Sequence, residues 1–280
     1  MIKSIHICTM DIRKWASDPK IYILYAMVFI LTNHFTHEFK MFSRHTGYRI
    51  TPWIFPFLID SFIFQLLIIF GIVFLFCDAP FMDDIQPYLL IRSTRHDWIL
   101  GKIYYIIVAT FIFLLFVNIS IILSLTPYMY YSSDWGKVLA TLAQTNASNM
   151  VQLIAINKKI LTNYTPFQAM TICFLLEWFC GIIIGLTLFS ANTLLNKRIG
   201  ILITSCIPLL DILFNAGFSS FSYHFSPTSM ARLSILDTSG FSRYPTPQYA
   251  FIFLLFLIGI LLAGVILIMK NQEINVIERL

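Results

Sequence analysis

Six long apolar stretches constrain the fold of this chain more than any other feature of its sequence. A helix needs about 20 mostly apolar residues to cross the hydrocarbon layer of a bilayer. Of the 280 residues, 58% are hydrophobic and 12% are charged, which is more apolar surface than one soluble core of this length can hide. The sequence therefore predicts an all-α integral membrane protein with six transmembrane helices, at residues 21–35, 53–77, 103–125, 169–193, 199–214 and 249–269.

The first 20 residues are more polar than the stretch that follows them, and they predict a separate element. Their pattern is typical of an amphipathic helix that lies on the membrane surface. Ile5, Ile12 and Trp15 would face lipid, and Arg13 and Lys14 would face phosphate. The expected organisation is therefore an interfacial helix (1–20), a six-span domain (21–270) and a short tail (271–280).

Basic residues in the connections predict the orientation of the chain. If the N-terminus is cytoplasmic, the inside segments hold eleven Lys and Arg residues and the longer outside segments hold eight. Cytoplasmic connections of membrane proteins carry the excess of basic residues. We therefore expect a multi-pass protein of the cell membrane with both termini in the cytoplasm.

The connection between the second and third spans, residues 78–102, is short and charged. It ends in the sequence Arg92-Ser-Thr-Arg95-His-Asp-Trp98-Ile-Leu-Gly101-Lys102. Arg92, Arg95 and Trp98 would form a basic and aromatic surface at the cytoplasmic edge of the membrane. The alternative is an ordinary charged loop that follows the positive-inside rule.

A short helix is expected within this connection. Asp84 can cap its first turn. Tyr88, Ile91 and Arg95 would share one face of that helix, because they are spaced three and four residues apart. Such a helix, held between two spans, can pass force from a soluble partner into the membrane.

This stretch resembles the cytoplasmic coupling loop of type-2 ABC exporter permeases, the superfamily of drug, polysaccharide and bacteriocin exporters. In that family the helix between spans two and three ends in a pattern like R-x-x-R-x-x-W-x-x-G-K, and this chain is similar from Arg92 to Lys102. The six-span layout, the amphipathic N-terminal helix and the Ser226-Pro227 element before the last span are also similar. The resemblance covers most of the chain in layout, and the coupling stretch in residues.

The resemblance implies a permease subunit that couples ATP hydrolysis by a separate subunit to export of an amphipathic substrate, such as a peptide. Two permease chains, identical or different, would pair in the membrane, and each would bind an ABC ATPase subunit. The residues that would contact the ATPase are Asp84, Tyr88, Ile91, Arg92, Arg95 and Trp98.

The chain lacks an ATPase site of its own. No G-x-x-x-x-G-K-[ST] motif occurs, since Gly136-Lys137 lacks both the upstream glycine and the following Ser or Thr. We therefore expect no catalytic, cofactor or metal site in this chain, with ATP and Mg²⁺ bound by the partner ATPase. Membrane lipids are also expected partners, and nucleic acid is not.

Four polar residues interrupt the predicted spans and are the candidate substrate pathway: Asp60, Gln65, Glu177 and Asp211. Charged side chains are costly in lipid, so each should face protein or water. Three carboxylates toward the outer side could line a cavity that attracts cationic cargo. The alternative is structural, with each residue hydrogen-bonded to a neighbouring helix.

Three further features leave alternatives open. His34, His37 and His45 in the first outer connection, with Glu38 nearby, could hold a metal, but polar residues at the headgroup level explain them better. Gly181 and Gly185 permit close helix contact, either within the chain or between two chains. The five cysteines form no C-x-x-C pair and indicate neither disulfides nor a zinc site.

Two other functional classes were weighed against the permease. An intramembrane hydrolase would need a motif such as H-E-x-x-H or G-x-S-x-G, and neither occurs. A membrane immunity or interaction protein, which binds a peptide or lipid without transporting it, would have a similar sequence apart from the coupling helix. It is the alternative to the exporter subunit.

Overall fold

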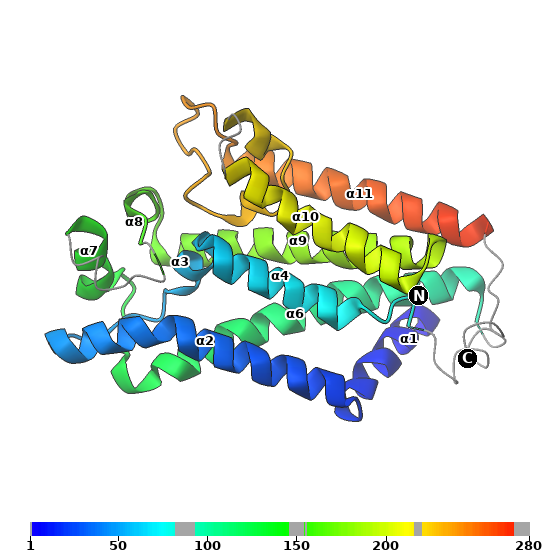
Figure 1. The fold of residues 1–280 in the computed structure, drawn as a ribbon, viewed down its shortest axis with the longest axis horizontal. Coiled ribbons are helices and arrows are strands. Elements are labelled where there is room, and N and C mark those ends of the chain that lie inside the picture. The colour runs from blue at the N-terminus through cyan, green and yellow to red at the C-terminus, as the bar shows by residue number, and fades with distance from the viewer. Residues whose placement is uncertain (1, 82–92, 146–153, 155, 216–219, 272–280) are drawn as a thin grey trace.

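The computed structural model describes residues 2–81, 93–145, 154, 156–215 and 220–271. Within these residues the regular structure is helical, with one isolated bridge between Ile50 and Met129 and no β-strand. The long helices run along one axis of the molecule, with α7 and α8 at one end and α1 at the other (Figure 1). These are called below the α7–α8 end and the α1 end.

The helices follow the expected order of apolar stretches. The α-helices are α1 (Ile2–Arg13), α2 (Pro19–Thr46), α3 (Phe55–Asp60), α4 (Phe62–Phe76), α6 (Arg95–Leu125), α7 (Gly136–Gln144), α8 (Lys158–Asn163), α9 (Pro166–Leu194), α10 (Lys197–Asn215) and α11 (Pro247–Asn271). Short 3-10 helices are η1 (Lys14–Ala16), η2 (Thr126–Tyr128), η4 (Ser220–His224) and η5 (Ser229–Ala231).

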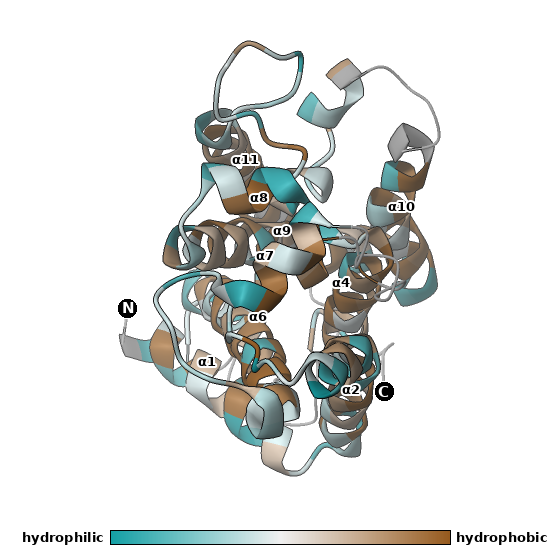
Figure 2. Ribbon diagram, turned by 90° about the vertical axis from the view of Figure 1, so that its left-hand side faces the viewer, coloured by the Kyte–Doolittle hydropathy of each residue, from teal (hydrophilic) through white to brown (hydrophobic). Residues whose placement is uncertain are grey.

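Three helical segments among the described residues are long and apolar enough to cross a membrane: Arg95–Tyr128, Pro166–Leu194 and Pro247–Met269. The apolar helix Phe62–Phe76 is shorter. Seen from the α7–α8 end, the long helices are hydrophobic over much of their length, and the connections are more polar (Figure 2). The chain is therefore an all-helical membrane protein with three helices that meet the length and composition of a span.

Two of the expected spans have different bounds from the prediction. α2 continues past Phe35 to Thr46, so His34, His37 and His45 lie on a helix and not in a loop. It ends at Gly47, which has a φ of 73° and closes the helix in the left-handed conformation that glycine favours. The stretch 53–77 is divided into α3 and α4 at Ser61, whose extended backbone breaks the helix.

The N-terminal helix also differs in part from its prediction. α1 is helical and Ile5 is exposed, as expected for a surface helix. Ile12 and Trp15, however, pack partly against the core, and the Trp15 indole donates a hydrogen bond of 2.9 Å to the Tyr105 hydroxyl. α1 is therefore fastened to α6, and two of the three side chains expected to face lipid face protein instead.

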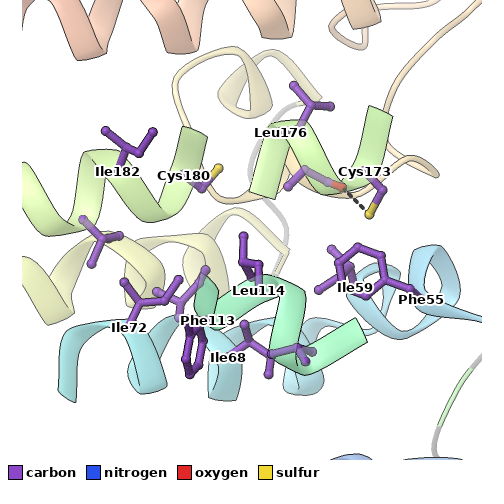
Figure 3. Packing of buried hydrophobic residues seen from close by; sticks show 14 of the residues in the cluster. Phe55, Ile59, Ile68, Ile72, Phe113, Leu114, Cys173, Leu176, Cys180 and Ile182 are labelled. Atoms are coloured by element: carbon purple, nitrogen blue, oxygen red, sulfur yellow. Dashed lines mark hydrogen bonds between the residues drawn. The ribbon is translucent and has the colours of Figure 1, made fainter. Parts of the chain in front are cut away.

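α9 lies at the centre of the core, packed against α4 and α6. Figure 3 shows buried side chains of α3, α4 and α6 that point toward α9, among them Ile59 and Leu114. A Cβ atom on Gly181 would lie 2.3 Å from the Thr110 methyl group, and one on Gly185 would lie 2.6 Å from Ile106. The two glycines therefore serve packing within the chain, in which α6 approaches α9 too closely for a side chain.

We predict that Gly181→Ala destabilises the protein by about 1–3 kcal/mol, the usual cost of overpacking a core. Thermal unfolding of the detergent-solubilised variant measures the effect. Gly259→Ala on α11 is the matched control, because no atom lies within 4 Å of the position of its added Cβ. Equal unfolding temperatures for the two variants would contradict the internal role of Gly181.

Candidate functional site

A segment that contains the short 3-10 helix η5 but no α-helix is buried between the helices toward the α7–α8 end. It consists of residues 226–236 and is called the inserted segment below. Eight of its side chains are buried: Ser226, Thr228, Ser229, Met230, Ala231, Arg232, Leu233 and Leu236. This agrees with the sequence, in which the Ser- and Pro-rich connection 215–248 is suited to re-enter a membrane where protein covers its backbone.

The inserted segment reaches about halfway along α9. The Cys180 thiol donates a hydrogen bond of 2.9 Å to the Pro227 carbonyl. The Cys173 thiol lies 3.7 Å from the Ala231 carbonyl, the contact that is dashed in Figure 3. Cys180 lies 14 residues beyond Pro166, where the 29-residue helix α9 begins, which is roughly 21 Å along the helix axis. The segment therefore enters the bundle deeply and does not rest on its end.

Gln65 joins the inserted segment to α9. Its side-chain amide donates hydrogen bonds of 2.7 Å to the Thr228 carbonyl and 3.0 Å to the Glu177 carboxylate. Both side chains are almost fully buried, Gln65 at 1% exposure and Glu177 at 0%. One amide therefore donates to a buried backbone carbonyl outside the α-helices and to a buried carboxylate.

Arg232 carries the positive charge of this site. Its guanidinium donates to the Asp211 carboxylate of α10 at 2.5 Å, and both side chains are buried. The charge also interacts electrostatically with Asp60 and Glu177. Asp60, which is partly buried, accepts a hydrogen bond of 3.1 Å from the Ser234 backbone. Asp60, Gln65, Glu177, Asp211 and Arg232 are called the Arg232 cluster below.

The structure brings together all four residues of the candidate substrate pathway. Asp60, Gln65, Glu177 and Asp211 lie around one segment, and each of them contacts protein. These hydrogen bonds are those expected of a structural role. Arg232 was missed, because the sequence places it in an outer connection as one more basic residue. Its only sequence signal is the Ser-Pro element a few residues before it.

A second buried ion pair lies at the α1 end. The Lys102 ammonium, at 0% exposure, contacts the Asp11 carboxylate at 2.7 Å and the Phe81 carbonyl at 3.4 Å. It also lies 5.6 Å from the Phe81 ring centroid and 5.7 Å from that of Trp98. Asp11, Phe81, Trp98 and Lys102 are called the Lys102 cluster below. It joins α1, α6 and Phe81, which follows α4.

Gly101 lets α1 approach α6 at this cluster. A Cβ atom there would lie 2.8 Å from the Ile7 side chain. Burial, with a contribution from the nearby Asp11 carboxylate, raises the pKa of the Cys8 thiol on the same side of α1, which keeps it neutral. Gly101 and Lys102, the last two residues of the motif, therefore hold the N-terminal helix in place.

Both flanks of residues 82–92 are fastened to the helices. On one side, the Asn192 amide of α9 donates to the Ala79 carbonyl at 2.9 Å, and Lys102 reaches Phe81. On the other side, the Thr94 hydroxyl caps α6 by accepting from the Asp97 backbone, and Ser4 donates to the Asp97 carboxylate at 3.3 Å. α1, α6 and α9 therefore all hold the ends of this stretch.

The residues expected to contact an ATPase are divided by the structure. Asp84, Tyr88, Ile91 and Arg92 lie outside the described residues. The extended backbone of Thr94 places Arg95 at the start of α6 and not on a short helix with Tyr88 and Ile91. Trp98 is fully buried, with its ring centroid 6.4 Å from that of Phe189, so its side chain presents no surface. Two nitrogens of the partly exposed Arg95 are buried without a hydrogen-bond partner.

Among the described residues, no group of three or more His, Cys, Asp or Glu residues is arranged to hold a metal ion. His34, His37 and His45 are exposed on α2. Comparisons of the chain with protein-family models, with curated proteins and with solved structures found no match.

We predict that Asp11→Asn destabilises the protein by about 3–5 kcal/mol, because it removes the carboxylate charge that lies 2.7 Å from the buried Lys102 ammonium. Chemical unfolding in detergent measures the change. Lys14→Gln is the matched control: it removes a second contact of Asp11, 3.1 Å long, whose lysine is 30% exposed, and should cost less than about 1 kcal/mol. Similar costs for the two variants would contradict the dominant role of the buried pair.

Proposed function

We propose that the chain is the membrane-spanning permease subunit of an ATP-driven exporter, with the ATPase on a separate polypeptide. The observation that carries the proposal is the anchoring of residues 82–92. Their two flanks are held by α1, α6 and α9 through Asn192, Lys102 and Asp97. A force applied to this stretch would therefore move three helices together, as a coupling element requires.

The helices support a six-span arrangement of the type-2 ABC exporter kind. α2 has 28 residues and α10 has 19, which correspond to roughly 42 Å and 28 Å of helix. α3 and α4 together extend from Phe55 to Phe76. With the three apolar segments, these lengths suit six crossings of a core about 30 Å thick. Polar side chains such as Lys40 and Asp211 lower the mean hydropathy of α2 and α10.

In this proposal the α1 end is cytoplasmic, together with both termini, and the α7–α8 end faces outward. Two permease chains, identical or different, pair in the membrane, and each binds an ATPase subunit that carries ATP and Mg²⁺. The substrate is amphipathic, such as a peptide. Closure of the ATPases pulls residues 82–92, and α6 and α9 pass the movement to the Arg232 cluster at the other end.

The topology predicts opposite labelling of two exposed positions. In a Cys206→Ser background, which removes the exposed native thiol, Asp134→Cys should react with a membrane-impermeant maleimide on intact cells. Asn196→Cys in the turn between α9 and α10 should react only after permeabilisation. Labelling of both positions from outside would contradict the proposed six-span topology.

The coupling stretch predicts a loss of ATPase binding when its charge is reversed. The double variant Arg92→Glu/Arg95→Glu should reduce co-purification of the ATPase about tenfold, because it removes two positive charges from the docking surface. The unfolding temperature should change little. Arg44→Glu, an exposed reversal at the α7–α8 end, is the control and should co-purify as the wild type does. Unchanged co-purification of the double variant would favour the non-transporting interaction protein.

A further inference from the structure

We propose that the Arg232 cluster is the binding site for a cationic group of the substrate, and that Arg232 occupies that site in the closed form. The inference rests on the proposed function and names its substrate class: an amphipathic molecule with a guanidinium or ammonium group. The inserted segment would act as a plug whose arginine takes the place of the substrate cation.

The balance of charge in the cluster is the first observation. Three carboxylates, those of Asp60, Glu177 and Asp211, lie around the segment that carries one guanidinium, and among the three the guanidinium hydrogen-bonds to Asp211. The exposed Lys159 interacts with Asp60 from the margin of the site. Buried charges in a membrane protein are paired with one another or serve a pathway. Acid is in excess here, so the site suits a further cation.

Two unpartnered atoms are the second, independent observation. Glu177 is fully buried, and its Oε2 accepts from Gln65 while its Oε1 has no hydrogen-bond partner. The Nε of Arg232, which is 4% exposed, also lacks a partner. A buried polar atom without a partner costs free energy. Glu177 Oε1 is therefore a buried acceptor that no donor uses, as expected of a site that binds a donor group.

The inserted segment is held by contacts that can be exchanged. Two of its backbone carbonyls accept from the thiols of Cys173 and Cys180, which are weak donors. The strongest contact is the Arg232–Asp211 pair, and a substrate cation can replace it charge for charge. A second cation on the acids would thus offset the loss of the ion pair, and the apolar part of the ligand would replace the buried contacts of Met230 and Leu233.

The surroundings of Arg232 indicate an amphipathic ligand and not a free metal ion. The guanidinium carbon lies 5.5 Å from the centroid of the Phe62 ring, and the buried Met230 and Leu233 flank Arg232 in the segment. Guanidinium and ammonium groups interact favourably with aromatic faces. Withdrawal of this segment would leave the carboxylates close to the Phe62 ring and to the apolar surroundings that Met230 and Leu233 had contacted.

Octylguanidinium and its neutral isostere octylurea test the proposal by calorimetry on the protein in nanodiscs, with empty nanodiscs subtracted. Arg232→Gln should bind octylguanidinium about tenfold more tightly than the wild type, because the competing cation is gone. Asp211→Asn in that background should abolish the gain, and this double variant should fold because it carries neither charge of the pair. Arg243→Gln, an exposed arginine of the same connection, should bind as the wild type does.

A second measurement uses the wild-type Arg232 cluster and guards against misfolding of the variant. Octylguanidinium, but not octylurea, should increase the maleimide labelling of Cys180, located by mass spectrometry, because withdrawal of the segment uncovers that thiol. Equal binding of the two probes, or unchanged affinity in Arg232→Gln with unchanged labelling of Cys180, would overturn the proposal.

The two proposals fail separately, because this experiment contains no ATPase. If the guanidinium binds as expected while the ATPase does not co-purify, the cation site stands in a protein that does not transport. If the ATPase co-purifies and the guanidinium does not bind, the permease stands and the cation site is wrong.

Discussion

The pairing of buried charge inside an apolar bundle is the constraint on which the rest of this structure depends. Lys102 and Asp11 meet this requirement at the α1 end, and Arg232 and Asp211 meet it at the α7–α8 end. An unpaired charge at either place would be strongly destabilising. Each pair therefore helps to hold one element in the bundle: α1 in one case and the inserted segment in the other.

α9 connects the two ends of the molecule. Its Glu177 and Cys180 contact the Arg232 cluster and the inserted segment, and its Asn192 holds the Ala79 carbonyl beside the Lys102 cluster. Between these residues lie Gly181 and Gly185, where α6 approaches most closely. A helix packed this tightly moves as a unit, because interiors have low compressibility. The proposed function uses this rigidity to join ATPase docking at one end to release of substrate at the other.

Sequence reasoning located the helices better than it located their ends. Each apolar stretch is mostly helical in the described residues, since length and hydropathy suffice to identify it. The extension of α2 to Thr46 and the break at Ser61 were missed. Polar side chains concealed the extension of α2. The break at Ser61 lies within an apolar stretch, and no Gly or Pro is adjacent to Ser61. Trp98 was expected at a surface because its sequence neighbours are charged, but burial depends on what α1 covers.

The sequence alone determined that this chain is helical and belongs in a membrane, because hydrophobic length is a property of a single segment. It also identified Asp60, Gln65, Glu177 and Asp211, since polar residues in apolar stretches are visible without any partner. Only the tertiary structure decided which groups they contact. Arg232 reaches Asp211 from 21 positions away through a segment that folds back into the bundle. Such a pairing depends on helices meeting in space, and no local pattern encodes it.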